Sequence, residues 1–259
     1  MTDAPFLEVR DLQHWFGGLH VIGGVGFSCR QGIIKAIIGP NGAGKTTLFN
    51  LISGAIPPAS GSISFLGEEI AGSPAHRIAW KGISRTFQAS RLFPGMTVLE
   101  NVMTGRHTAS RSGFLSCMFA RPRALREERE IRDAAMDILS RLGIAELAGK
   151  DGHSLPFGRQ RIVEIARALA ARPRLLLLDE PACGLTMRET EEMGERITGI
   201  RDAGTTILIV EHDMSLVMGI SDEVVVLSYG RKIAEGAPRE IQSNPEVIEI
   251  YLGSENGHA

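Results

Sequence analysis

The sequence predicts an α/β fold in which a largely parallel sheet carries helices on both faces. Three strand-like apolar runs, residues 175–179, 205–210 and 223–227, are separated by segments with helical periodicity at 188–201 and 214–220. This alternation is typical of a parallel sheet, because parallel neighbours need a crossover connection. The chain has 259 residues, 43% apolar and 22% charged, which is enough for one sizeable core with a smaller subdomain.

The N-terminal part shows the same alternation. Residues 6–12 partly alternate between apolar and polar side chains, which predicts an early strand. Residues 33–38 are apolar, rich in β-branched side chains and bounded by glycines, so a buried strand is expected there. A helix is predicted over 44–52 from the spacing of its leucines and isoleucine, and a strand over 62–66 follows a Pro- and Gly-containing turn.

The middle third of the chain differs in character from its flanks. Segments 126–142 and 159–171 each place apolar residues on one helical face with charges opposite, which predicts a helical region. Between them and the N-terminal part, residues 106–122 are basic and contain Ser and Gly. This stretch is predicted to be a surface loop with a short amphipathic segment.

Composition excludes several classes of protein. A net charge of −2 argues against binding to nucleic acid through charge. The longest apolar runs fall far short of the roughly 20 residues that a membrane helix needs. The N-terminus has no secretory signal, and the three cysteines lack metal-site spacing, so we expect a cytosolic chain with reduced thiols.

Residues 39–46 match the phosphate-loop pattern G-x-x-x-x-G-K-[ST], between a predicted strand and a predicted helix. Backbone N–H groups of such a loop surround phosphate oxygens, Lys45 would bind the β- and γ-phosphates, and the Thr46 hydroxyl would ligate Mg²⁺. A glycine-rich turn that binds nothing is the alternative, but the strand–loop–helix context favours ATP binding. The expected contact residues are Gly39, Pro40, Asn41, Gly42, Ala43, Gly44, Lys45, Thr46 and Thr47.

Two carboxylates, Asp179 and Glu180, directly follow four leucines at the end of a predicted strand. Strands of open α/β sheets direct their carboxyl ends toward the ligand crevice. Asp179 would hold Mg²⁺ through its water shell, and Glu180 would orient and polarise an attacking water. A plain exit of the strand into solvent is the alternative, which the phosphate loop makes less favoured.

A third turn, Leu-Pro-Phe-Gly-Arg-Gln at residues 155–160, precedes the second predicted helix of the middle third. The order phosphate loop, Gln88, this turn, Asp179-Glu180 and His212 resembles the ATP-binding subunits of ABC transporters over nearly the whole chain. The resemblance implies a P-loop (RecA-like) parallel core with an antiparallel β portion and a helical signature subdomain. It also implies that two subunits enclose two ATP molecules, each between one phosphate loop and the other subunit's signature turn.

The resemblance also implies roles for residues that mean little singly. Gln88 would reach Mg²⁺ and the attacking water, and His212 would contact the γ-phosphate, so that Glu180, His212 and Gln88 form the catalytic set. Gly158 and Gln160 of the signature turn would contact the partner's ATP. Phe16 is placed to stack on adenine, with Trp15 as the competing candidate, although either ring could belong to the core.

The signature turn departs from the common Leu-Ser-Gly-Gly-Gln form. Pro156 stands where a serine hydroxyl would bind the γ-phosphate, and Phe157 replaces a glycine. Backbone N–H groups near Gly158 would therefore carry more of that contact. Arg159 opposes the dipole of a helix start, which is understandable if a phosphate or carboxylate lies near; a simple exposed arginine is the alternative.

Several segments resemble the larger ATP-binding subunit of branched-chain amino-acid importers. They are residues 85–88 with 91–93, the insert 106–123, residues 211–222 and the tail 244–253. Importers of amides or urea and the ATPase of lipopolysaccharide export are sister alternatives, and the insert favours the amino-acid branch over the exporter.

The resemblance implies partners and a location as well. We expect transmembrane permease subunits, a second ATP-binding subunit (identical or a paralogue), indirectly an extracytoplasmic solute-binding protein, and a peripheral position at the cytoplasmic face of the inner membrane. The single domain would comprise a nucleotide-binding core (about 1–90 and 172–235), a helical subdomain (about 91–171) and a C-terminal helical tail (about 236–259). A soluble ABC ATPase without a permease is the alternative of another class, and a catalytically inert nucleotide-binding module is disfavoured by Glu180 and His212.

Overall fold

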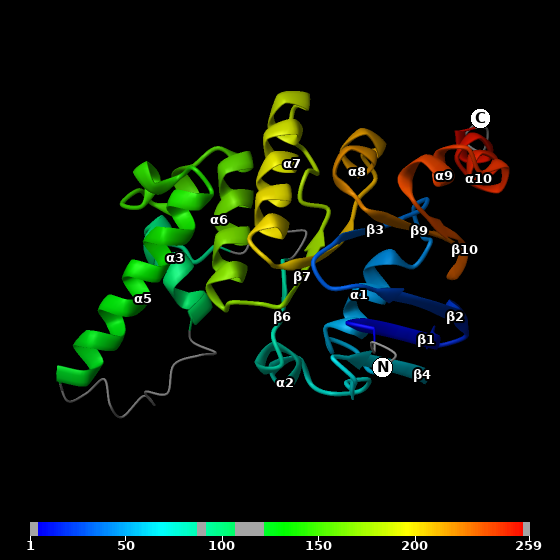
Figure 1. The fold of residues 1–259 in the computed structure, drawn as a ribbon, viewed down its shortest axis with the longest axis horizontal. Helices are drawn as coiled ribbons and strands as arrows, with labels where there is room; N and C mark the ends of the chain where they lie inside the picture. Colours follow the sequence, from blue (N-terminus) through cyan, green and yellow to red (C-terminus); the bar gives the residue numbers. More distant parts are fainter. Residues whose placement is uncertain (1–4, 87–91, 107–121, 256–259) are drawn as a thin grey trace.

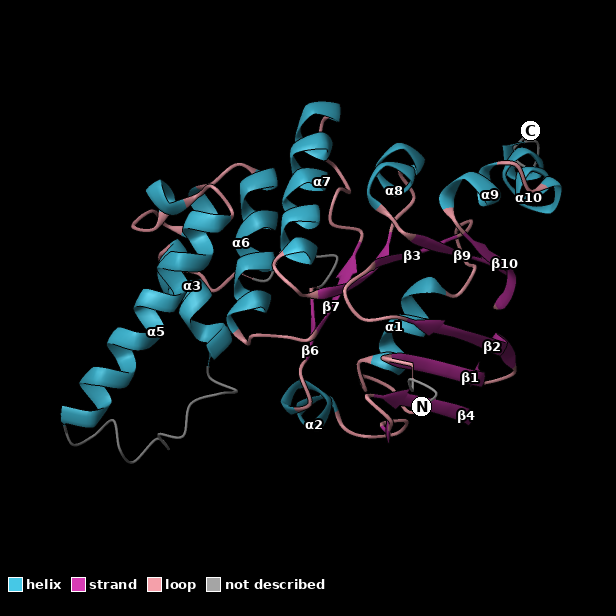
Figure 2. Ribbon diagram, in the orientation of Figure 1, coloured by secondary structure: helices cyan, strands magenta, loops and turns pink. Residues whose placement is uncertain are grey.

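A computed structural model describes residues 5–86, 92–106 and 122–255, and its strands form two sheets (Figures 1 and 2). The larger sheet has the strand order β10–β9–β3–β8–β7–β6, and the smaller one has the order β2–β1–β4–β5. Within the described residues, no helix combines the length and the apolar character that crossing a membrane would require.

Five strands of the larger sheet run parallel, as the sequence predicts. They are β3 (Ile34–Ile38), β6 (Ile83–Arg85), β7 (Leu175–Asp179), β8 (Thr206–Val210) and β9 (Glu223–Ser228). The antiparallel edge strand β10 (Arg231–Gly236) follows β9 through a tight turn. Every residue of β3, β7 and β8 is buried, which explains why these strands are continuous apolar runs in the sequence.

The smaller sheet is antiparallel and consists of β1 (Leu7–Phe16), β2 (Leu19–Cys29), β4 (Ser60–Phe65) and β5 (Glu68–Glu69). The apolar and polar pattern did not predict β2, because glycines interrupt it. The register between β1 and β2 shifts near Asp11 and Gly24, which both have a positive φ, and the two strands bend there.

Figure 1 shows that α3, α5 and α6 lie farthest from the antiparallel sheet and that α7 lies between them and α8. Their bounds are α1 (Lys45–Ile52), α2 (Ala75–Trp80), α3 (Val98–Thr104), α5 (Pro122–Arg141), α6 (Phe157–Ala170), α7 (Met187–Asp202), α8 (Met214–Ile220), α9 (Pro238–Gln242) and α10 (Pro245–Glu255). The helices predicted in the middle third correspond to α5 and α6. The predicted loop with an amphipathic segment falls mostly on residues 107–121, outside the described residues.

The parallel sheet separates two hydrophobic cores. In β7, Leu176 and Leu178 face the core shared with α5, α6 and α7, whereas Leu175 and Leu177 face the core shared with α1 and the antiparallel sheet. Successive strand residues point to opposite faces, so each β7 leucine serves one core. Because a core packs on each face of the sheet, the carboxyl ends of its strands are held in place from both faces.

Helix α3 begins with a capping box that predicts a measurable contribution to stability. The Thr97 hydroxyl accepts from the Glu100 N–H at 3.2 Å, and the Glu100 carboxylate accepts from the Thr97 N–H at 2.8 Å. We expect Thr97→Ala to lower the free energy of unfolding by about 1 kcal/mol in urea denaturation. Thr97→Ser, which keeps the hydroxyl, is the control; equal losses in both variants would contradict a role for the cap.

Candidate nucleotide-binding site

The phosphate loop connects β3 to α1, and its glycines are required by close packing. Gly39 has a φ of 150°, and a Cβ there would stand 2.1 Å from the Leu227 carbonyl oxygen. Gly44 has a φ of 98°, and a Cβ there would stand 2.9 Å from the Val21 carbonyl oxygen. Side chains at these two positions would push the loop away from β9 and β2.

A cavity of about 280 Å³ opens over this loop. Its lining residues are Val21, Asn41, Gly42, Ala43, Gly44, Lys45, Thr46, Thr47 and Glu180. The Lys45 ammonium donates to the carbonyl oxygens of Gly39 (2.7 Å) and Pro40 (3.0 Å). Burial lowers the pKa of Lys45, and the carboxylates of Glu180 and Asp179 oppose that shift. The fold thus brings the predicted lysine and the predicted acids into one electrostatic site.

Asp179 ends β7 almost fully buried, with 2% of its surface exposed. Its Oδ2 forms an ion pair with Arg85 at 2.9 Å. Its Oδ1 is buried and has no hydrogen-bond partner in the part of the chain that the structure describes. A buried carboxylate oxygen without a partner is costly unless a ligand or water satisfies it, so this atom fits a cation or its hydration shell.

Glu180 follows with a φ of 49°, an unfavourable conformation for a residue with a side chain. Its N–H donates to the Val210 carbonyl oxygen at 2.9 Å, which fixes the backbone beside β8. The side chain lines the cavity over the phosphate loop. The structure therefore holds this carboxylate next to Lys45 at the cost of backbone strain.

Arg85 is a site residue that the sequence did not single out beyond its place in the resemblance. Its Nη1 donates to Asn50 Oδ1 (2.7 Å) and Ser53 Oγ (3.0 Å), while Nη2 pairs with Asp179. One buried guanidinium thereby joins β6, the end of α1 and the carboxyl end of β7. Gln88, predicted to follow this strand, lies outside the described residues.

His212 lies after β8 with an exposed side chain, and the neighbouring Glu211 is fully buried. Glu211 Oε1 accepts from the Ala182 N–H at 2.7 Å, and Oε2 accepts from the His212 N–H at 3.1 Å. Glu211 therefore joins the loop of His212 to the turn after Glu180. Sequence reasoning missed Glu211, although its position directly after a buried strand is the signal that identified Asp179.

The Glu211 carboxyl predicts a pH dependence of stability. Burial raises its pKa above the usual 4.5, against three backbone N–H groups that lower it. The folded chain then retains a proton that the unfolded chain has lost, so this contribution to stability is complete below about pH 4.5 and is lost as the pH rises through the folded pKa.

Glu211→Gln cannot titrate, so its free energy of unfolding should decline less between about pH 4.5 and pH 7 than that of the parent chain. The variant should also be less stable overall, because one amide oxygen cannot replace both acceptors. Urea denaturation across this range measures both effects. Parallel pH profiles for the two proteins would contradict the assignment.

The signature turn forms the start of α6, with Pro156 as its N-terminal cap. The Gln160 side chain donates back to the Leu155 carbonyl oxygen at 2.9 Å. A Cβ on Gly158 would stand 2.9 Å from Glu189 Oε1, so this glycine lets α6 approach α7 closely. Hydrogen bonds from Thr186, which caps α7, are the main cause of the lowered pKa of Glu189, and the positive charge of Arg159 adds to it. A carboxylate therefore does lie near Arg159.

Gly158 and Gln160 are absent from the described lining of the cavity over the phosphate loop. That the turn acts on a partner's nucleotide therefore stays a prediction.

Phe16 and Trp15 both lie on the surface at the end of β1, so neither belongs to the core. Phe16 is 51% exposed and meets His14 edge-on, with ring centroids 4.7 Å apart. Trp15 is 40% exposed, and one face of its indole is covered by the parallel ring of His20 at 4.3 Å. Neither ring lines the described cavity, and the covered face of Trp15 favours Phe16 as the aromatic surface for a base.

Tyr251 on α10 also reaches the phosphate loop, and sequence reasoning missed it. Burial raises the pKa of its hydroxyl to about 12, while a hydrogen bond with the Gly39 backbone opposes that shift. The contact joins the C-terminal helix to the first residue of the loop. The sequence offered no signal for it beyond the resemblance of the tail.

Comparisons with known proteins agree with this geometry. The ABC transporter family matches residues 22–183, and the branched-chain amino acid ATP-binding cassette transporter family matches residues 231–256. The high-affinity branched-chain amino acid transport ATP-binding protein BraF of Pseudomonas aeruginosa is 44% identical over 96% of this chain and 98% of its own. The corresponding protein LivG of Escherichia coli (strain K12) is 43% identical with the same coverage.

Solved structures show the same fold. The ADP conformation of MJ1267, an ATP-binding cassette of an ABC transporter, superposes with a TM-score of 0.83 and 30% identity, covering 96% of this chain and 99% of its own. CbiO1 from Clostridium perfringens, part of the ABC transporter complex cbiONQ, gives a TM-score of 0.80 and 30% identity, covering 97% and 96% of the two chains.

Proposed function

Because this chain belongs to the ABC transporter family and is one of its ATP-hydrolysing cassettes, we propose that it powers a membrane importer of branched-chain amino acids. The observation that carries the substrate class is the likeness to BraF and LivG over nearly the full length, tail included. The ATPase itself does not need to touch the amino acid, since its work is to open and close with the nucleotide.

We assign roles in the site as follows. Backbone N–H groups of residues 39–44 and the Lys45 ammonium bind the phosphates, and Phe16 stacks on the base. Mg²⁺ neutralises charge on the phosphates when it is bound, and the residues that would hold it are Thr46, Asp179 and Gln88. The buried Asp179 Oδ1, which has no hydrogen-bond partner among the described residues, supports this assignment.

Glu180 accepts a proton from the attacking water, and His212 orients the γ-phosphate. The Glu180 carboxylate lines the same cavity as Lys45 and Thr46, which supports an in-line attack at that end of the nucleotide. The Glu211 carboxylate fixes the position of the His212 loop relative to the turn after Glu180.

Two cassettes would close around two ATP molecules, with Gly158, Gln160 and the first N–H groups of α6 facing the partner's γ-phosphate. The helical subdomain, about residues 91–171, would move against the core of about 1–90 and 172–235, and 236–259 would form the tail. The second cassette and a solute-binding protein complete the proposed importer, with this chain on the cytoplasmic face of the inner membrane.

Affinity purification from native membranes, followed by mass spectrometry, tests this function. We expect two multi-span permeases, a second ATPase and a solute-binding protein that binds branched-chain amino acids. Recovery of only soluble partners from well-solubilised membranes would remove the transporter assignment and favour a soluble ABC ATPase. Recovery of a permease with an amide- or urea-binding protein would reassign the substrate.

A further inference from the structure

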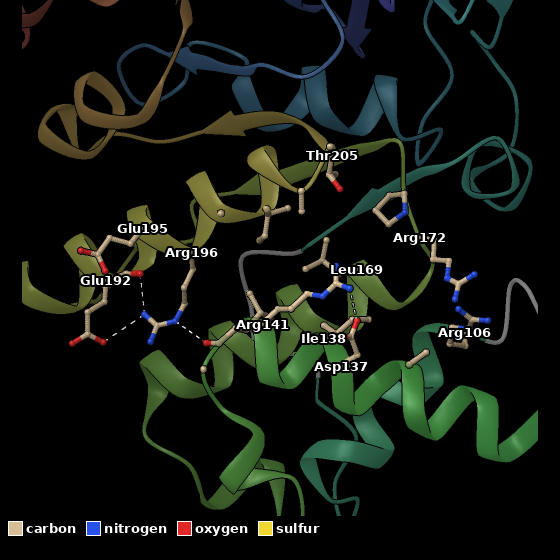
Figure 3. A pocket seen from close by; sticks show the side chains of 18 residues that line it. Arg106, Asp137, Ile138, Arg141, Leu169, Arg172, Glu192, Glu195, Arg196 and Thr205 are labelled. Carbon is tan, nitrogen blue, oxygen red and sulfur yellow. Dashed lines mark hydrogen bonds and ion pairs between the residues drawn. The ribbon is translucent and has the colours of Figure 1, made fainter.

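A second cavity, of about 1010 Å³, lies between α5, the end of α6 and α7 (Figure 3). We call it the α5–α7 groove. Arg172 and Thr205, which line it, precede β7 and β8, whereas Asp179 and the phosphate loop follow the carboxyl ends of their strands. The groove therefore lies at the amino ends of the parallel strands, and the nucleotide site lies at their carboxyl ends.

The lining of the groove is partly apolar. Ile138 of α5, Leu169 of α6 and Ile200 of α7 contribute aliphatic side chains from three separate helices. The volume matches that of pockets which bury small organic molecules, and such pockets are mostly apolar with a few placed charges.

Two arginines at one end of the groove, Arg106 and Arg172, differ from the other arginines that line it. Arg141 and Arg196, elsewhere in the groove, pair with Asp137 (2.7 Å) and Glu192 (3.5 Å). Within the described residues, Arg106 and Arg172 form no ion pair, and the Arg106 Nε is buried without a hydrogen-bond partner. Figure 3 shows the two guanidinium groups close to each other at this end.

The electrostatic surroundings of Arg106 agree with this reading. Burial and the positive charge of Arg172 both lower the pKa of Arg106, and Glu130 opposes them. Two like charges held side by side repel each other, and a bound anion would relieve the repulsion by bridging the two guanidinium forks.

We propose that the α5–α7 groove binds an amphipathic organic anion, with its charged head between Arg106 and Arg172 and its apolar body along Ile138, Leu169 and Ile200. A guanidinium pair selects a carboxylate or phosphate head, and the aliphatic lining selects a hydrocarbon body over a sugar or a base. The site is separate from the one that binds ATP, and its occupation does not depend on the transport function.

Gly199 offers a way to block the groove without harming the fold. It lies inside α7, and no atom stands within 4 Å of the position that its Cβ would take. Gly194 of the same helix differs, because a Cβ there would stand 2.9 Å from Leu216. Leucine at position 199 should project into the groove, and replacing a helical glycine favours the helix.

The test is isothermal titration calorimetry of the full chain with decanoate, kept dilute enough to remain monomeric. Decanol, with the same tail and no charge, is the comparison ligand. We expect decanoate to bind at one site and decanol at least tenfold more weakly. Arg106→Gln and Arg172→Gln should each weaken decanoate binding about tenfold, and Gly199→Leu should abolish it.

Two matched variants control for general effects. Arg239→Gln removes an exposed arginine from α9, and Gly219→Leu fills open space beside α8; both should bind decanoate like the parent. ATP binding, measured in parallel, should be unchanged in all five proteins and reports folding. Absence of decanoate binding, or equal binding by the parent, the arginine variants and Gly199→Leu, would overturn the proposal.

Discussion

Glu180→Gln is expected to reduce ATP turnover about a thousandfold while leaving ATP affinity within a few-fold of the parent, because a general base of this kind contributes roughly 10²- to 10⁴-fold. Glutamine keeps the size of the side chain and the strained backbone that Glu180 already adopts. It cannot accept a proton from water, so the bound nucleotide should persist. A coupled phosphate-release assay measures the turnover number, and equilibrium titration measures the affinity.

The same variant should be trapped as an ATP-dependent dimer in gel filtration, since the nucleotide that joins the two chains is no longer cleaved. Glu249→Gln, at an exposed position on α10, is the matched control and should hydrolyse ATP like the parent and return to monomer. Turnover close to that of the parent in Glu180→Gln would remove this residue from the role of general base.

The parallel sheet could be predicted because its strands are buried on both faces. A strand such as residues 175–179 has no polar face to interrupt the apolar run, so burial alone makes the pattern visible. Its carboxyl end carries Asp179. Because parallel strands direct their carboxyl ends toward the ligand crevice, the two acids could be predicted to lie near the phosphate loop. An element or a site could be predicted wherever one short segment contains the whole pattern that identifies it.

Other elements depend on contacts between distant residues. Strand β2 contains Gly23, Gly24 and Gly26 and is held by its long pairing with β1 rather than by its own preference for strand. Strand β10 has three exposed and three half-buried residues that do not alternate, so no pattern marked it. Helix α3 was missed although its signal was present, since Thr97 and Glu100 form a readable capping box.

The candidate site shows the same division. The phosphate loop and the two acids lie within short segments, and each has a recognisable pattern. Arg85 and Asp179 are 94 residues apart, and Glu211 lies 29 residues from Ala182, so no local pattern could join them. These positioning contacts arise only when the sheet assembles, and the sequence contains them as single polar residues beside buried strands.

Lys45→Ala is expected to weaken ATP binding by about 10- to 100-fold, because a charge-assisted contact to phosphate contributes about 1.5–3 kcal/mol. Lys45 is 7% exposed, and its ammonium is held over the loop by the carbonyl oxygens of Gly39 and Pro40. It is therefore placed in advance for the β- and γ-phosphates. Titration calorimetry without Mg²⁺ isolates the contribution of the lysine from that of the cation.

The affinities for ATP and AMP together show whether Lys45→Ala removes a contact with the phosphates or disturbs the conformation of the loop. AMP has no β- or γ-phosphate, so Lys45→Ala should bind AMP as the parent does while losing its preference for ATP. Lys81→Ala, which removes a half-buried lysine paired with Glu68, should change neither affinity. Equal losses for ATP and AMP would mean that the substitution disturbs the loop itself, and unchanged ATP affinity would count against residues 39–46 as the phosphate site.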